Sequence, residues 1–548
     1  STSAIDAASG YSTGRSGFEF TALGGIQEKS SLTESDVYSA TAISHQDFIV
    51  RLTDSNVVVP GTNQPISNHE FPLKAEVTSS SYAWNYSFAD FFVILNFEIE
   101  NKSKNNWDSV YLAWWSDMVV RNVNVTQESG AAFFNKGGAG VLEDWSSFYV
   151  FQVSGDDVDY TKSYGAAMIL GVDWRGEYYH PNNAQAIIDK GFRAPVINYN
   201  FWEFNSQSGG DFTFPSTEEE KYFRLKNSVG LQKPDFKDRL KNASNKIQLI
   251  SIGPIENIAP GEKVNFAVAL VAAKQIEDIN ATSTSDTEPA REQLYEHLGW
   301  AKRTFLGEDV NENGKLDQEF DENENGILDP EEDKNGNGKL DEEDLNGNGK
   351  LDRYVLPEPP RTPNVKLVPG DGFVDVYWDD YSVNSIDPIS KKQDFEGFKL
   401  YRSNTNDDQS GDLLSSAKLL AQWDSTNNKI GFNNGFDAIK LETPKEIDGE
   451  KYHFHYRING LLNGWQYMII VTAFDQGDEE LGLQPLESSF TASALRAWGG
   501  TQPVAIEKNG NGEVGVYPNP FSTEALWDGA GSRSRKLYFY NLPANCTI

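Results

Sequence analysis

Short apolar segments separated by turn residues fill the chain from residue 21 to 286. Residues 90–100 have a solid apolar centre followed by alternation. Further on, Val110, Leu112 and Trp114 recur with a period of two, which is typical of a half-buried strand. The pattern predicts a mainly β fold, with one large β-sandwich or two fused sandwiches in this region. Further strands are expected at 164–171 and 264–271.

One segment, residues 287–308, has a helical rather than a strand-like pattern. Leu294, Leu298, Ala301 and Phe305 recur at steps of three or four residues and form a single apolar stripe. We therefore expect an amphipathic helix there, which leads directly into the repeat segment at residue 309 and packs under the first repeat.

Residues 356–500 return to strands. Val374–Trp378 and Gly397–Arg402 are apolar, aromatic segments, and Leu461 precedes Tyr467 by six residues. The segment resembles a fibronectin type III domain, in which Trp378 is the core tryptophan and Tyr467 forms the tyrosine corner. The resemblance implies a β-sandwich whose penultimate strand begins at Tyr467.

The two ends of the chain differ from its middle. Residues 1–20 are small and polar. Residues 501–548 contain Val516–Phe521, with the sequence Val-Tyr-Pro-Asn-Pro-Phe, and then an apolar strand pattern from Lys536. This end resembles part of the type A sorting domain of type IX secretion. The sorting-domain resemblance implies export to the cell surface and a structural role for Cys546. Residues 250–271 also resemble a module that is common in large secreted proteins of the Bacteroidetes and related phyla.

Between residues 309 and 355 one twelve-residue pattern occurs four times, beginning at Asp309, Asp321, Asp333 and Asp344. Each copy has Asp, Asn, Asn, Gly and Asp at positions 1, 3, 5, 6 and 9. Calcium loops take oxygen ligands from positions 1, 3, 5, 7, 9 and 12 and use a glycine at position 6 for the turn. The expected ligands are Asp309, Asn311, Asn313, Lys315, Asp317, Asp321, Asn323, Asn325, Ile327, Asp329, Glu332, Asp333, Asn335, Asn337, Lys339, Asp341, Asp344, Asn346, Asn348, Lys350 and Asp352, with position 7 acting through its carbonyl.

Helices do not fit between loops spaced this closely, so the repeats are not EF-hands. They resemble thrombospondin type 3 repeats or chained dockerin-like loops, which implies two to four bound Ca²⁺ ions. Position 12 is Phe320 in the first loop and Val355 in the fourth, so the middle loops are the better sites. The alternative is a disordered acidic linker. We expect the array to be a rigid spacer between the N-terminal sandwich region and residues 356–500.

The acidic net charge limits the classes of partner that the chain is expected to bind. The net charge is −34, and residues 309–352 contribute −12 of it through sixteen acidic residues against four lysines. Such a chain should avoid nucleic acid.

No apolar run in the sequence reaches transmembrane length. The single cysteine excludes an intrachain disulfide, and calcium can stabilise a secreted protein instead. The start at Ser1 is interpreted as a processed N-terminus.

No catalytic motif stands out, and we expect no enzyme activity. His453 and His455 could form only a weak metal pair on one strand face, and zinc-protease, nucleophile-elbow and phosphate-loop motifs are missing from the sequence. Paired carboxylates beside tryptophans would suit a glycosidase, although we favour the interpretation that these tryptophans fill the core and the acids lie in turns. The residues concerned are Asp117, Glu143, Asp144, Asp173 and Glu177, with Trp114, Trp115, Trp145 and Trp174.

These features favour a secreted, calcium-stabilised surface protein of a Gram-negative-type bacterium, with a structural or adhesive role, for example in a filament. Its expected partners are copies of itself, other surface proteins or polysaccharide, together with the type IX secretion machinery. The alternative is a secreted protein that binds or degrades polysaccharide.

Overall fold

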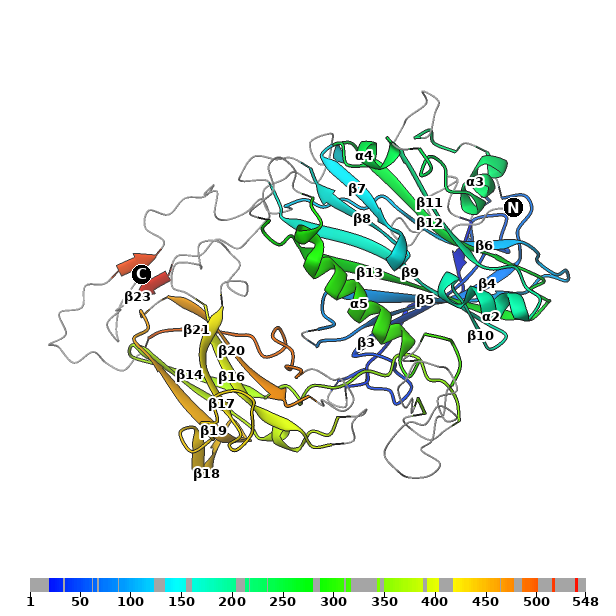
Figure 1. Cartoon of the computed structure of the whole chain (residues 1–548). Helices are drawn as coiled ribbons and strands as arrows, with labels where there is room; N and C mark the ends of the chain where they lie inside the picture. Colours follow the sequence, from blue (N-terminus) through cyan, green and yellow to red (C-terminus); the bar gives the residue numbers. More distant parts are fainter. Residues whose placement is uncertain are drawn as a thin grey trace. The chain divides into compact units, whose positions relative to one another are not determined.

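The chain is mainly β, as predicted, and forms several antiparallel sheets. It divides into two compact units (Figure 1), of which unit 1 comprises Ser1–Trp84, Ala89–Asn122 and Thr126–Val355, and unit 2 the remainder. The computed structural model describes residues 19–32, 35–61, 63–66, 69–86, 88–122, 134–153, 160–203, 212–215, 217–233, 235–278, 286–309, 312–316, 343–344, 349–387, 392–403, 417–463, 465–477, 485–500, 515–517 and 538–540.

Unit 1 is built on a ten-stranded antiparallel sheet in the order β1-β3-β4-β5-β13-β9-β8-β7, with β2 paired to β3 and β10 to β9. The strands predicted near residues 90, 164 and 264 are its three central members, β5, β9 and β13. The strand bounds are β1 Thr21–Ala22, β2 Gln27–Lys29, β3 Gln46–Thr53, β4 Ala75–Ala83, β5 Phe92–Asn101, β7 Gly137–Leu142, β8 Ser147–Gln152, β9 Ser163–Trp174, β10 Glu177–Tyr179 and β13 Lys263–Lys274.

A second, three-stranded sheet packs against the first, in the order β11 (Val196–Glu203), β12 (Lys246–Ile255) and β6 (Val110–Ser116). The alternation predicted for β6 is confirmed, because Val110, Leu112 and Trp114 pack against the main core while Trp115 is exposed. The sandwich therefore has two unequal sheets within one compact unit.

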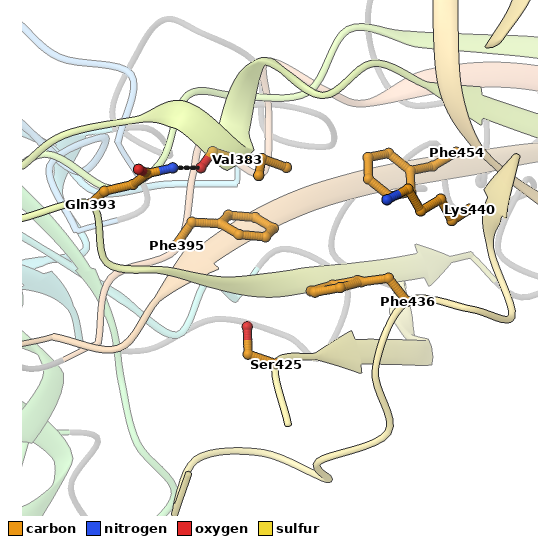
Figure 2. A pocket seen from close by; sticks show the side chains of 7 residues that line it. All are labelled: Val383, Gln393, Phe395, Ser425, Phe436, Lys440 and Phe454. Atoms are coloured by element: carbon orange, nitrogen blue, oxygen red, sulfur yellow. Dashed lines mark hydrogen bonds between the residues drawn. The ribbon is translucent and has the colours of Figure 1, made fainter. Parts of the chain in front are cut away.

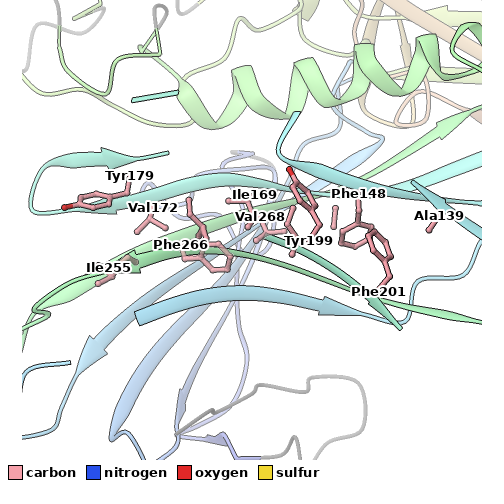
Figure 3. Packing of buried hydrophobic residues seen from close by; sticks show 14 of the residues in the cluster. Ala139, Phe148, Ile169, Val172, Tyr179, Tyr199, Phe201, Ile255, Phe266 and Val268 are labelled. Carbon is pink, nitrogen blue, oxygen red and sulfur yellow. The ribbon is translucent and has the colours of Figure 1, made fainter. Parts of the chain in front are cut away.

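The main core lies between these two sheets (Figure 3), where Phe148, Ile169 and Val268 from the large sheet meet residues of β11 and β12. On β13, Val264, Phe266 and Val268 belong to this core, and Ala267 and Ala269, which point to the opposite face of the strand, are also buried. Burial on both faces explains why this strand is a nearly continuous apolar run.

Helix α5 (Glu292–Leu306) packs on β13, β5 and β9. Its predicted stripe is confirmed, since Leu294, Leu298, Ala301 and Phe305 are all buried. The helix delivers the chain to Asp309, three residues beyond its last turn. The other helices are α2 Ala184–Asp189, α3 Glu218–Lys226, α4 Phe236–Leu240 and the 3-10 turns Glu143–Trp145, Pro181–Asn183, Pro289–Arg291 and Tyr381–Asn384.

Unit 2 contains a second sandwich of two four-stranded sheets, ordered β14-β15-β19-β18 and β17-β16-β20-β21. This order is the one expected when an immunoglobulin-type ABED sheet faces a CFG sheet that has gained one further edge strand. The bounds are β14 Val365–Gly370, β15 Phe373–Trp378, β16 Phe395–Arg402, β17 Lys418–Asp424, β18 Lys440–Ile447, β19 Glu450–Asn459, β20 Gln466–Asp475 and β21 Leu495–Trp498.

Two residues singled out in the sequence organise this sandwich. Trp378 is fully buried in its core, next to Phe398 and Phe454. Tyr467 is the second residue of β20. Its hydroxyl accepts a hydrogen bond from the backbone N–H of Leu462 at 2.8 Å. A tyrosine hydroxyl bonded to the backbone a few residues upstream is the geometry of a tyrosine corner.

Toward the C-terminus the structure describes only a two-stranded pair, β22 (Gly515–Tyr517) with β23 (Tyr538–Tyr540). Cys546 and the rest of the predicted sorting segment lie outside the described residues, as do residues 1–18. None of the helices in the described part of the chain has the length and apolar character needed to cross a membrane.

The pH dependence of unit 2 should depend on Asp475, which is buried at the end of β20 and whose Oδ1 accepts backbone N–H groups from Gly477 and Leu486. Burial raises the pKa of Asp475 from 3.8 to about 7. Between these values the folded protein keeps a proton that the unfolded chain releases, so stability falls as the pH rises through this window. We expect the free energy of unfolding of unit 2 to drop by roughly 2 kcal/mol from about pH 5 to about pH 8.

Thermal unfolding at the two pH values checks this expectation. Asp475→Asn, which cannot ionise, should reduce the dependence, and the rest should come from Asp379, whose pKa burial raises to about 6. Asp371→Asn in an exposed turn of the same unit should leave it unchanged. An equally steep dependence in Asp475→Asn would show that other groups cause it.

Candidate calcium-loop segment

Six of the twenty-one predicted calcium ligands lie in the described part of the chain, at the two ends of the repeat segment. They are Asp309, Asn313, Lys315, Asp344, Lys350 and Asp352. The fifteen that lie outside the described residues are Asn311, Asp317, Asp321, Asn323, Asn325, Ile327, Asp329, Glu332, Asp333, Asn335, Asn337, Lys339, Asp341, Asn346 and Asn348.

The first and fourth loops form the same local turn. Gly314 has a φ of 72° and donates its backbone N–H to Asp309 Oδ2 at 3.0 Å. Gly349 also has a φ of 72° and donates to Asp344 Oδ2 at 2.8 Å. Position 6 thus adopts the left-handed conformation that favours glycine, and it folds back onto the carboxylate of position 1. The sequence pattern predicted this turn from the glycine alone.

Asp309, position 1 of the first loop, has one buried carboxylate oxygen that no protein donor satisfies. Its side chain is fully buried, and Oδ2 accepts hydrogen bonds while Oδ1 is buried without a hydrogen-bond partner. Burial raises the pKa of Asp309, although the adjacent Arg353 opposes the rise. A buried carboxylate oxygen without a donor is costly, and a Ca²⁺ ion would satisfy it. The residues present therefore fit a calcium ion at position 1 of the first loop.

The rest of the coordination sphere would come from positions outside the described residues. Within the described ranges, no three side chains of His, Cys, Asp or Glu come together as a metal site. The structure thus shows the anchoring turn at each end of the array.

The array begins and ends at the same place on unit 1. The backbone N–H of Glu308 donates to the carbonyl of Asp352 at 3.0 Å, and the N–H of Asp352 donates to Glu308 Oε2 at 2.8 Å. A rigid spacer between two regions needs ends that are far apart, whereas the two ends of this segment, at Glu308 and Asp352, are hydrogen-bonded to each other. The prediction of a rigid spacer is therefore wrong. The backbone spacing of the repeats gave no indication of this closure.

Three of the five carboxylates proposed for glycoside hydrolysis form ion pairs with basic side chains. Asp173 accepts a hydrogen bond from Arg353 at 3.0 Å, and Glu177 forms an ion pair with Lys190. Glu143 is exposed and pairs with Lys237. Burial raises the pKa of Asp117 at the end of β6.

Most of the tryptophans near these carboxylates are packed inside the protein, as a core role requires, and are not exposed as platforms for a sugar. Trp174 is buried in the main core and Trp114 packs against it. Trp145 is half-buried and stacks on Tyr295, with ring centroids 6.1 Å apart. Trp115 is 52% exposed, so one of these four residues presents its ring to solvent.

His453 and His455, the possible weak metal pair, each contact a different carboxylate. His455 Nε2 lies 2.8 Å from Asp375 Oδ1, which also accepts a hydrogen bond from Arg457. His453 Nδ1 lies 3.2 Å from Asp380 Oδ1. Each histidine of β19 therefore lies within hydrogen-bond distance of a different carboxylate.

A serine–histidine contact that the sequence did not indicate occurs in unit 1. Ser146 Oγ lies 3.0 Å from His180 Nε2, and both residues are buried. However, His180 Nδ1 accepts the backbone N–H of Asn182 at 3.2 Å, so the ring proton is on Nε2 and is donated to the serine. Burial lowers the pKa of His180 to about 4. A general base needs the opposite tautomer, so this pair cannot activate the serine.

A cavity of about 310 Å³ opens in the sandwich of unit 2 (Figure 2). The rings of Phe395, Phe436 and Phe454 line it, and Gln393 donates a hydrogen bond to the carbonyl of Val383 at 2.6 Å. Lys440 is its one titratable lining residue, so the cavity holds no acid–base pair.

Comparisons with known proteins leave the chain without a family. No family model matches it, and no curated protein does. Among solved structures, a putative aldose 1-epimerase from Escherichia coli K12 shows 9% identity over 46% of this chain and 69% of that chain, with a TM-score of 0.16. A β-1,2-glucanase from Parabacteroides distasonis shows 10% identity over 72% and 37%, with a TM-score of 0.14. Astrotactin-2 shows 10% identity over 78% and 59%, with a TM-score of 0.16. Likenesses this weak carry no argument about fold or activity.

Proposed function

We propose that this chain is a secreted, calcium-stabilised surface protein that acts through association and not through catalysis. The observation that carries the calcium part is the repeated end turn. Two loops 35 positions apart place a left-handed glycine on the carboxylate of their first aspartate with the same φ. That turn is what a twelve-residue calcium loop requires at positions 1 and 6.

The module assignments support the same proposal. The strand order of unit 2 and the Tyr467–Leu462 hydrogen bond are the features expected of a fibronectin type III-like domain. The Tyr-Pro-Asn-Pro-Phe sequence at residues 517–521 supports a type IX sorting segment, and with it a cell-surface location.

Association is supported by two edge strands that carry exposed apolar side chains. Among the described strands, β6 ends the three-stranded sheet with Trp115 exposed, and β17 ends a sheet of unit 2 with Leu419 and Leu420 exposed. By contrast, the edge strand β18 presents charged residues and Pro444, which discourage strand pairing. Edge strands with exposed apolar side chains can add a strand from another molecule.

Sedimentation of the purified chain in calcium tests the proposal. We expect an assembly of at least two copies. Trp115→Lys should weaken it roughly tenfold or more if this edge lies in the contact. Glu442→Lys on the already charged β18 edge is the matched control and should have no effect. A monomer under all calcium concentrations, together with glycan hydrolysis that is lost in Asp117→Asn, would favour the enzyme instead.

A further inference from the structure

Arg353 follows directly on the last predicted ligand of the fourth loop, yet its side chain reaches the first ligand of the first loop. Its NH1 donates to Asp309 Oδ2 at 3.0 Å, across 44 positions of sequence. The contact is largely shielded, since 14% of the Arg353 side chain is exposed and none of the Asp309 side chain is.

The rest of unit 1 fixes the guanidinium in this position. NH2 donates to Asp173 Oδ1 on β9 at 3.0 Å. The guanidinium also lies over the rings of Tyr178 and Phe305, 4.9 Å from each ring centroid. An arginine held by two carboxylates and two aromatic faces has little freedom to move, because its planar fork matches both kinds of partner.

This clamp determines which oxygen of Asp309 remains for an ion. Oδ2 receives both the Arg353 guanidinium and the backbone N–H of Gly314. Oδ1 is buried and has no hydrogen-bond partner. The carboxylate is thereby oriented with one oxygen satisfied by protein donors and the other available as a ligand.

We infer that Arg353 is a positioning residue for calcium in the first loop, and that it couples this site to the closure of the loop base. The inference rests on the proposed calcium function. The first loop depends on such help because Phe320 occupies its position 12, where the second and third loops have a carboxylate. Calcium in the first loop and closure at Glu308 and Asp352 then stabilise each other, because coupling between two equilibria is reciprocal.

A competing effect has the opposite sign. Arg353 is itself a cation, and its charge repels a nearby Ca²⁺ ion. Asp173 offsets that charge, since it shares the guanidinium with Asp309. If the orientation of Asp309 by Arg353 is the larger effect, removing the guanidinium weakens calcium binding. If the repulsion between Arg353 and Ca²⁺ is the larger effect, removing the positive charge tightens calcium binding. Arg353→Lys keeps the charge but cannot hold both carboxylates, whereas Arg353→Gln removes the charge.

Hydrogen exchange measured by mass spectrometry across a calcium titration separates these outcomes, because it resolves the loops. In both Arg353 variants of the full chain, we expect the calcium concentration that half-protects residues 309–316 to rise roughly five- to tenfold, within the usual range of coupling between sites. The half-protection concentration for residues 333–341 should change less than twofold. Arg291→Lys is the matched control, because Arg291 is also buried in unit 1 and paired to Asp286. It should leave the first-loop value unchanged.

An unchanged or lowered half-protection concentration for residues 309–316 in the Arg353 variants would overturn the inference. An equal shift in all loops, reproduced by Arg291→Lys, would also overturn it by showing general destabilisation. A wild-type chain in which calcium protects no loop would instead overturn the proposed calcium function, and the two failures are thus distinguishable.

Discussion

Chelating calcium is expected to make residues 309–352 accessible to trypsin, with cleavage at least roughly 100-fold faster than in the calcium-loaded chain. The segment carries sixteen acidic residues against four lysines, so without bound cations its carboxylates repel one another. Saturation at 100 times the dissociation constant stabilises one site by about 2.7 kcal/mol, which corresponds to this factor when cleavage follows local opening. Several ions would raise it further.

Trypsin suits this experiment because its sites lie inside the loops, at Lys315, Lys334, Lys339 and Lys350. Peptide masses then show which loop opened. Magnesium in place of calcium is the control, since it prefers a rigid octahedral site with retained waters and should protect less. Equal cleavage rates with calcium and with excess chelator would mean that the segment does not bind the ion, or is ordered without it.

Phe305→Ala is expected to destabilise unit 1 by about 3–5 kcal/mol, the usual cost of removing a buried phenylalanine side chain. Phe305 is 2% exposed, and its ring lies 5.9 Å from that of Tyr354 and 4.9 Å from the Arg353 guanidinium. The substitution therefore leaves a cavity beneath the residues that close the loop base. The calcium needed to protect residues 309–352 should rise as well.

Phe398→Ala is the matched control in unit 2, where Phe398 is fully buried in the other sandwich. It should lower the unfolding temperature of unit 2 by a comparable free energy and leave calcium protection of the loops unaltered. Thermal unfolding combined with the protease assay reads both effects. If Phe305→Ala lowers stability without changing calcium protection, the helix does not support the loop base.

Helices and strands with one buried face were predictable from the sequence, because apolar residues recur along them at the period of the helix or strand. The stripe of α5, the alternation of β6 and the buried Trp378 illustrate this. The turn at Gly314 was predictable for a different reason, since glycine at position 6 specifies a local backbone conformation.

Contacts between distant positions were not predictable in this way. The closure of Glu308 on Asp352 and the reach of Arg353 to Asp309 depend on how α5 and β9 pack, and no local pattern encodes them. The rigid spacer was the simplest interpretation of a linear repeat, and the prediction was wrong for this reason. The contact between Ser146 and His180 likewise joins a 3-10 turn to a strand end, and its chemistry is decided by a backbone N–H that the sequence does not reveal.

The central claim, that residues 309–352 bind calcium, is tested most directly by counting the ions bound per chain in equilibrium dialysis at calcium concentrations through roughly 10⁻⁴ to 10⁻³ M, where extracellular modules often bind. We expect two to four ions for the wild-type chain, and a loss of ions when Asp321 and Asp333, the first ligands of the two middle loops, are replaced with Asn. A wild-type chain that binds no calcium, or an ion count that survives both substitutions unchanged, would contradict it.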